Sequence, residues 1–197
     1  TDRDDLIELA TAHHQDLVRF HAAITMIDTG NDAEVQKAMG ILNELAARQD
    51  PRIAPFEGIT LARISRDKIQ KATPWVESLA QNKDADEGIR RSAVTTLFYL
   101  KSPSAPGLFA KLAAEQTQTV QQIKLGLIAI EFGEQLKASQ LSALESSRSR
   151  LVRSIVEIAH RVADGGSATD GLLKLLQEGH PLILDWALGY SDSVDAD

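Results

Sequence analysis

Three of the five histidines lie near the start of the chain, where imidazole side chains could bind a metal ion. They are His13, His14 and His21, in a stretch that we expect to be helical. His14 and His21 would lie two turns apart on one side, about 10 Å along the axis. Two metal ligands on one helix stand at i and i+4, and Val18 occupies that position. We therefore expect His13 to pack in a helix seam and the other two to flank an interface, with zinc binding as the alternative.

A second candidate for metal chemistry is the pair Glu157 and His160, three residues apart in an expected helix. This spacing is half of a di-iron carboxylate site, which needs two such pairs and two more glutamates from facing helices. The chain has one such pair. We therefore expect no metal site and place both residues in an outward-facing row.

Other catalytic and cofactor chemistry has no motif in this chain. The absence of cysteine excludes disulfides, zinc–thiolate sites and cysteine nucleophiles. Ser146, Ser147 and Ser149 form an expected turn without a His or Asp at a motif spacing that would activate a hydroxyl. No glycine-rich nucleotide loop is present. We expect no catalytic residue and no cofactor.

Charge restricts the partner. The 197 residues carry 21 Lys and Arg against 28 Asp and Glu, a net charge of −7. Duplex-binding domains instead carry a cationic patch, so we expect no nucleic-acid partner and favour a basic protein or peptide. The chain has one cluster of basic residues, which we interpret as a solvated helix face paired with Glu145 and Glu157. Alternatively, the cluster binds an acidic partner or phosphate. Its members are Arg148, Arg150, Arg153 and Arg161.

Composition favours a helical, water-soluble domain. Hydrophobic residues make up 43% of the chain and charged residues 25%, with only 6 Pro and 12 Gly. No window approaches the roughly 18 to 20 apolar residues of a membrane span, so we expect no membrane association. A chain without cysteine suits cytoplasm and periplasm alike. It begins at Thr1 rather than Met, as a processed protein or a piece of a longer one would.

A spacing of 31 residues recurs through the second half of the chain. Similar apolar segments open at Ile89, Val120, Leu151 and Leu182, and a shorter apolar stretch precedes each. Apolar residues recur five and eight positions into the segments, which traces one helical face. These are Val94, Leu125, Val156 and Ala187, then Leu97, Ile128, Ala159 and Tyr190. The period predicts stacked helix pairs, each burying its apolar face against its neighbours as in a solenoid.

The run from Asp86 to Leu97, with an acidic turn before Ile89 and Arg90 and a small residue at Ala93, resembles the second helix of a HEAT repeat. The run from Ala105 to Leu112, with Pro106 in its first turn, is similar to the next first helix. The resemblance covers roughly residues 74–190. At the 31-residue spacing, the position of Arg90 becomes Gln121, Val152 and Ile183. The resemblance implies an α-solenoid that binds partners along its inner curve. HEAT-like chains also include bilin-attaching lyases and base-excising glycosylases.

The first third of the chain is helical but less repetitive. Heptad-like apolar spacing predicts one long amphipathic helix from Asp4 to Ile27. Gly30 suits a left-handed helix end, and Asn31 or Asp32 suits the cap of a second helix from about Ala33 to Arg48. A third helix is expected to open near Pro51 and to break before residue 74.

These elements predict one all-α domain over residues 1–190. Residues 1–73 would be degenerate repeats or an N-terminal cap, residues 74–190 HEAT-like helix pairs, and residues 191–197 a flexible acidic tail. The apolar seam of the opening helix, if left uncovered, could mediate a homo-oligomer.

If the second helices line a concave face, one row of their residues forms a ribbon across it. Gly126 inside a helix costs about 0.5–1 kcal/mol relative to Ala, which indicates close approach by another backbone or a ligand or, alternatively, tight packing of adjacent helices. The ribbon comprises Arg91, Thr95, Phe98, Gln122, Gly126, Arg153, Glu157 and His160. We expect a non-enzymatic interaction or scaffold domain that docks a protein or peptide there. An enzyme of lyase or glycosylase type is the alternative.

Overall fold

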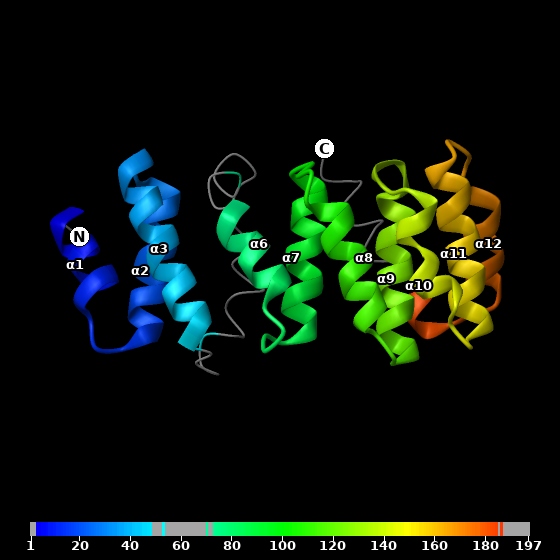
Figure 1. Ribbon diagram of the computed structural model, residues 1–197, viewed down its shortest axis with the longest axis horizontal. Helices are drawn as coiled ribbons and strands as arrows, with labels where there is room; N and C mark the ends of the chain where they lie inside the picture. Colours follow the sequence, from blue (N-terminus) through cyan, green and yellow to red (C-terminus); the bar gives the residue numbers. More distant parts are fainter. Residues whose placement is uncertain (1–2, 49–52, 54–69, 71–72, 185, 187–197) are drawn as a thin grey trace. The chain divides into compact units, whose positions relative to one another are not determined.

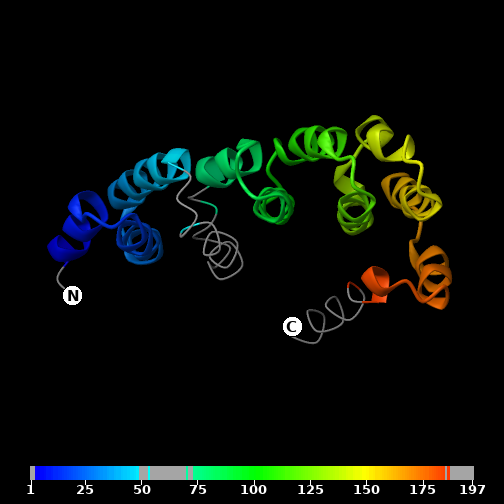
Figure 2. The same ribbon diagram turned by 90° about the horizontal axis from the view of Figure 1, so that it is seen from below.

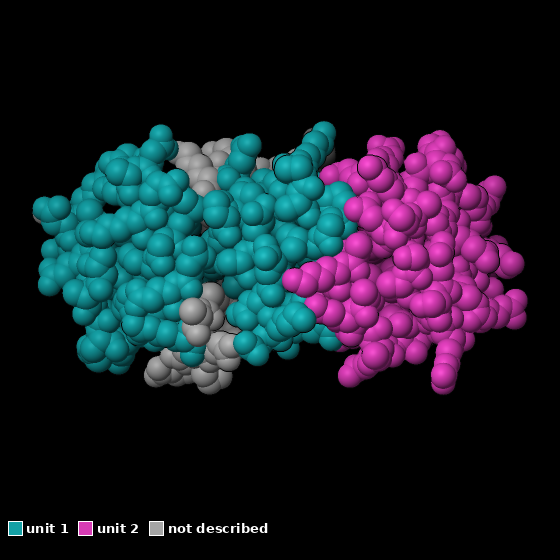
Figure 3. Space-filling model, in the orientation of Figure 1, with its two compact units in different colours: residues 1–108 teal, residues 109–197 magenta. Residues whose placement is uncertain are grey.

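A computed structural model describes residues 3–48, 53, 70, 73–184 and 186. The regular elements in these ranges are all helices, and no strand occurs among them (Figure 1). The expected all-α class is therefore confirmed. The chain groups into two compact units, residues 1–108 and residues 109–197 (Figure 3). The single domain over residues 1–190 stays a prediction.

Unit 1 is built from helices that pack on their neighbours in the sequence. They are α1 (Arg3–Ala12), α2 (Asp16–Thr29), α3 (Asp32–Arg48), α6 (Thr73–Gln81) and α7 (Glu87–Tyr99). Helix α2 packs against both α1 and α3, and α6 packs against both α3 and α7. The core contains large side chains that are almost completely buried, among them Phe20, Leu42 and Trp75.

Unit 2 centres on α11 (Arg150–Ala163), which packs against four other helices (Figures 1 and 2). These are α9 (Thr119–Glu131), η1 (Gly133–Gln135), α10 (Ser142–Glu145) and α12 (Thr169–Gln177). Helix α8 (Ala105–Glu115) begins in the last residues of unit 1 and ends in unit 2. A second short helix, η2 (Ala138–Gln140), lies between η1 and α10 in the sequence.

The repeating apolar columns are core positions, as predicted, wherever the structure describes them. The buried members are Val94, Leu125 and Val156 five residues into the segments, and Leu97, Ile128 and Ala159 eight residues in. Ala187 and Tyr190 lie outside the described residues. The opening column is not uniformly buried, because Ile89 is buried whereas Val120 is 47% exposed.

The prediction of a single long helix from Asp4 to Ile27 is wrong, because the helix is interrupted between α1 and α2. At the break, the backbone N–H of Gln15 donates to Nδ1 of His13 at 3.1 Å. Such side-chain bonds to the local backbone compete with helix continuation. The two shorter helices fold back on one another, which buries Ala10, Phe20 and Ile27 of the heptad-like seam within the chain. Homo-oligomer formation through that seam stays a prediction.

The second expected helix is confirmed as α3, and Asn31 caps it. Asn31 Oδ1 accepts from the N–H of Glu34 at 3.1 Å, and Glu34 Oε2 accepts from the N–H of Asn31 at 2.7 Å. This reciprocal arrangement satisfies amide groups that a helix start leaves unpaired. The left-handed conformation expected of Gly30 is wrong, because its φ is −81°. The third expected helix falls largely outside the described residues, as does the tail.

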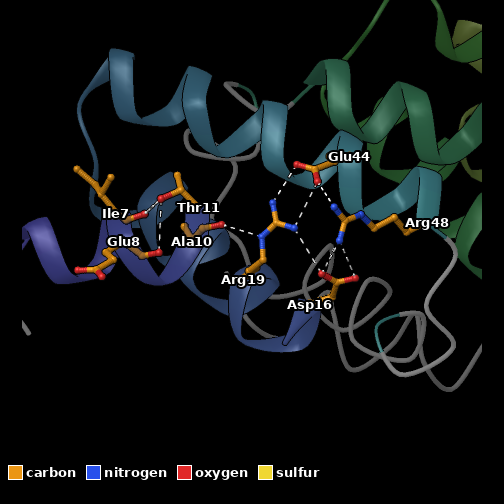
Figure 4. Close-up of polar contacts among 8 residues, drawn as sticks. All are labelled: Ile7, Glu8, Ala10, Thr11, Asp16, Arg19, Glu44 and Arg48. Atoms are coloured by element: carbon orange, nitrogen blue, oxygen red, sulfur yellow. Dashed lines mark hydrogen bonds and ion pairs between the residues drawn. The ribbon is translucent and has the colours of Figure 1, made fainter. Parts of the chain in front are cut away.

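One hydrogen bond recurs in four helix pairs. The fourth residue of the second helix donates a side-chain N–H to a backbone carbonyl near the end of the first. Arg19 reaches Ala10 at 3.2 Å (Figure 4), Arg90 reaches Ala80 at 3.4 Å, Gln122 reaches Gln116 at 2.9 Å, and Arg153 reaches Ser147 at 2.7 Å. Ala10 and Ala80 lie in the last turn of their helices, where carbonyls have no intrahelical partner, and Gln116 and Ser147 lie in the turn just after theirs. The bond therefore fixes the chain where each first helix ends.

Candidate functional site

Unit 2 contains a cavity of about 520 Å³ beside the turns that lead into α9 and α11. Its wall combines small apolar side chains from the end of α8 with hydroxyl and amide side chains from the two turns. The described lining residues are Ala113, Ala114, Gln116, Thr117, Thr119, Gln122, Ala143, Ser146, Ser147, Arg148 and Ser149. We call this cavity the turn pocket.

A chain of hydrogen bonds holds one wall of the turn pocket together. Arg153 Nη1 donates to the carbonyl of Ser147, whose Oγ donates to Oε1 of Gln122 at 2.7 Å. Nε2 of Gln122 in turn donates to the carbonyl of Gln116 at 2.9 Å. Ser147 is only 7% exposed. The two turns are therefore fixed to one another by side chains of α9 and α11, which positions the pocket before any ligand arrives.

Several polar groups of the turn pocket are left available for a ligand. The side chains of Gln116, Thr117, Thr119 and Arg148 make no hydrogen bond with another described residue. Hydroxyl and amide side chains both donate and accept, whereas the guanidinium of Arg148 only donates. Arg148 is the one charged side chain in the described lining. The pocket can thus hydrogen-bond a polar ligand and favours negative charge, while its described lining holds no carboxylate or imidazole.

The structure places two residues of the predicted ribbon in the core rather than on a surface. Phe98 is fully buried in unit 1, so its aromatic ring is core packing. Gly126 is also buried, and a Cβ atom there would lie 2.6 Å from Cγ2 of Ile155. This contact agrees with the alternative interpretation, tight packing of adjacent helices, and docking at Gly126 stays a prediction.

The other ribbon residues of unit 1 are only partly exposed. Arg91 and Thr95 lie on α7, and the hydroxyl of Thr95 donates to the carbonyl of Arg91 at 3.1 Å. Burial lowers the pKa of the Arg91 guanidinium, although Glu87 and Asp86 oppose that effect. These two residues belong to unit 1 and are not part of the turn pocket.

In unit 2, the ribbon residues Gln122 and Arg153 are linked through their hydrogen bonds to Ser147. Further along α11, Nε2 of His160 is hydrogen-bonded to Oε1 of Glu145 on α10. Glu145 was expected to pair with an arginine of the basic face, and this expectation is corrected by the bond to His160. Glu157 is exposed on the same helix. Docking on these residues stays a prediction.

The N-terminal histidines do not form the arrangement expected of one continuous helix. The rings of His13 and His14 stack with centroids 4.5 Å apart, while His21 lies across the helix break with its ring against Phe20. A cavity of about 490 Å³ is lined by Asp5, Glu8, Leu9, Ala12, His13 and His14. Among the described residues no three metal-binding side chains are placed to hold an ion.

Sequence reasoning missed Ser147 and the two threonines as site residues. The 31-residue spacing assigned Gln121 and Val152 to the position of Arg90, whereas Gln122 and Arg153 make the equivalent bond. Helix α9 begins at Thr119, 32 residues after Glu87, and α11 begins at Arg150, 31 residues after Thr119. When the repeats are aligned at their helix starts, instead of at their apolar segments, Gln122 and Arg153 take the position of Arg90.

Comparison with known proteins gave no match to a family model, to a curated protein or to a solved structure. In the part of the chain that the structure describes, no helix has the length and apolar character needed to cross a membrane. The carboxylates whose pKa is shifted in the described residues, Glu34 and Glu44, both have a lowered value.

Proposed function

We propose that the helix pairs are HEAT-type repeats stacked as an α-solenoid and that the chain is a non-enzymatic interaction or scaffold domain for a protein or peptide. The hydrogen bond from the fourth residue of each second helix supports the common origin of the pairs. Because α1 and α2 share this bond, we favour degenerate repeats over a separate cap for the N-terminal region.

The observation that carries the binding function is the turn pocket with its available polar groups. A peptide backbone carries a donor and an acceptor on almost every residue, and both need partners when they leave water. Gln116, Thr117 and Thr119 supply both kinds of group at one edge of the pocket. Ala113, Ala114 and Ala143 leave room beside them for side chains of the partner. We therefore assign the docking surface to the turn pocket and the adjoining starts of α9 and α11.

The proposal is tested by filling the pocket. Ala114→Trp places a large side chain at an exposed lining position, whereas Lys111→Trp makes the same addition one turn earlier on α8, outside the described lining. Wild-type protein and both variants are immobilised and exposed to native lysate, after size-exclusion chromatography has shown the same oligomeric state for each. A partner should be retained by wild type and Lys111→Trp and lost by Ala114→Trp.

The captured protein is then purified and its affinity is measured by calorimetry with all three proteins. Loss of about tenfold or more in affinity for Ala114→Trp alone would support docking in the pocket. Equal affinity for the three proteins, or no protein retained by wild type, would contradict this function.

A further inference from the structure

We propose that the segment bound in the turn pocket is an extended acidic peptide stretch of the partner protein, with at least one carboxylate held by Arg148. This inference rests on the proposed function and specifies the chemistry of the occupant. It reverses, for this one site, the basic partner that the net charge of −7 favours.

The charge in the described lining of the turn pocket is positive, whereas the whole chain carries a net charge of −7. Arg148 is the one charged residue in the described lining, and it is exposed with no ion pair to another described residue. Arg150 is exposed two residues further on, and Arg153 lies behind the lining, where its guanidinium donates to the carbonyl of Ser147. The nearby Glu145 is bonded to His160 instead. Local charge of one sign in a concave site attracts the opposite sign, whatever the distant surface carries.

The arrangement of the polar groups favours an extended chain over a small anion. A site for a small anion gathers several donors around one point, as a bidentate arginine and backbone amides do. Here the available groups are spread over two turns, from Gln116 and Thr119 on one side to Arg148 on the other, and most of them accept as well as donate. A volume of about 520 Å³ lies within the usual range of ligand pockets. It is therefore large enough to take side chains of a bound peptide.

A flexible pocket wall would lose entropy when a peptide binds and would therefore lower the affinity. Hydrogen bonds hold this wall in place. Ser147 is held from two helices, since its Oγ donates to Gln122 on α9 and its carbonyl accepts from Arg153 on α11. Its Oγ also accepts from the N–H of Ser149 at 3.2 Å. Arg148 lies between these two anchored serines, so the backbone that carries its guanidinium is fixed on both sides. A backbone that is already fixed loses less entropy when the side chain it carries binds a carboxylate.

The test uses the full chain and three fluorescent peptides of about eight residues, in which glycine alternates with Asp and Glu, with Asn and Gln, or with Lys. Binding is measured by fluorescence anisotropy at roughly 50 mM and 200 mM salt. We expect the acidic peptide to bind about tenfold tighter than the neutral one, and the basic peptide to bind more weakly than both.

Two variants with the same change in charge separate a defined site from diffuse attraction. Arg148→Glu should weaken binding of the acidic peptide about tenfold or more, and Arg148→Lys should restore part of the affinity. Arg161→Glu, at the other end of α11 and also exposed, should leave it within about twofold. Arg148→Gln provides a second variant with a smaller change, and circular dichroism checks that each protein is folded.

Four results would overturn the inference. They are equal affinity for acidic and neutral peptides, equal weakening by Arg148→Glu and Arg161→Glu, displacement of the acidic peptide by millimolar inorganic phosphate, or no binding of the acidic peptide. If the partner captured from lysate is nevertheless lost by Ala114→Trp, only the acidic chemistry fails and the proposed function stands. If that capture is also unaffected by Ala114→Trp, the proposed function fails as well.

Discussion

Glu34 has a lowered pKa because an arginine side chain and a backbone amide both donate to its carboxylate. Arg3 donates from Nε to Oε1 at 2.6 Å and from its Nη2 to the other oxygen. The N–H of Asn31 adds a bond to Oε2 at 2.7 Å. The Arg3 guanidinium and then the Asn31 amide lower the pKa of Glu34 to about 2 from an ordinary value of 4.5. One residue thereby links the start of α1 to the start of α3.

This link should weaken in acid. Because the folded protein holds Glu34 at a lower pKa than the unfolded chain does, its stabilising effect is complete above about pH 5 and is lost as the pH falls toward 2. Glu34→Gln should therefore lower the thermal midpoint at pH 7, and the difference from wild type should shrink steadily on acidification. Circular dichroism melting curves between these pH values measure it. A constant difference across the range would show that the charge of Glu34 has no part in the effect.

Helices α9 and η1 both pack closely on α11, and a glycine occupies one contact of each. A Cβ at Gly126 would lie 2.6 Å from Cγ2 of Ile155, and one at Gly133 would lie 2.7 Å from Cγ1 of Val162. Both partners are β-branched side chains, which have few alternative rotamers. Ile155 is also fully buried, so the helices would have to move apart to admit a methyl group.

Gly126→Ala should therefore destabilise the protein by about 1–2 kcal/mol, since overpacking of a tight core outweighs the gain of about 0.5–1 kcal/mol in helix propensity. Gly40→Ala is the matched control, because Gly40 lies in α3 with no atom within 4 Å of an added Cβ. That substitution should stabilise by about 0.5–1 kcal/mol. Urea unfolding of the three proteins measures both effects. Changes of the same sign would contradict the packing argument.

The elements could be predicted from the sequence where burial follows from helix pitch alone. Val94, Leu125 and Val156 are buried as expected, because a column of apolar residues must face the same side of successive helices. The break after α1 could not be predicted in this way, since the heptad-like pattern runs through it. The turn pocket was missed for a related reason. Its residues come from two turns whose meeting depends on the bonds of Ser147, Gln122 and Arg153, and no periodicity records those bonds.

At the scale of the whole chain, the described structure consists of two units held internally by contacts between neighbouring helices. Unit 1 has a charged cluster in which buried Arg19 bonds Glu44 at 2.9 Å and approaches Asp16 at 3.4 Å, while Arg48 bonds the same two carboxylates (Figure 4). Arg19 also donates to the carbonyl of Ala10. The cluster therefore joins α1, α2 and α3 around one buried guanidinium.

Arg19→Met should loosen unit 1 without loosening unit 2. The substitution removes the donor to Ala10 and leaves the two carboxylates with Arg48 alone, so α1 to α3 should open more often. Hydrogen exchange measured by mass spectrometry should show faster exchange in these helices and unchanged exchange in α9 and α11, because each helix pair depends mainly on its neighbours. Faster exchange throughout both units would instead indicate that the chain unfolds as one cooperative body.

The bond from the fourth residue of each second helix spans turns of different length. The turn has three residues between α1 and α2 and between α8 and α9, four between α10 and α11, and five between α6 and α7, and the bond forms across all four. The same closure therefore tolerates insertions and deletions at the hairpin bend. This makes each hairpin an exchangeable part: a bend could be lengthened, or a foreign loop grafted into it, and the pair would still close as long as an Arg or Gln stands at that fourth position.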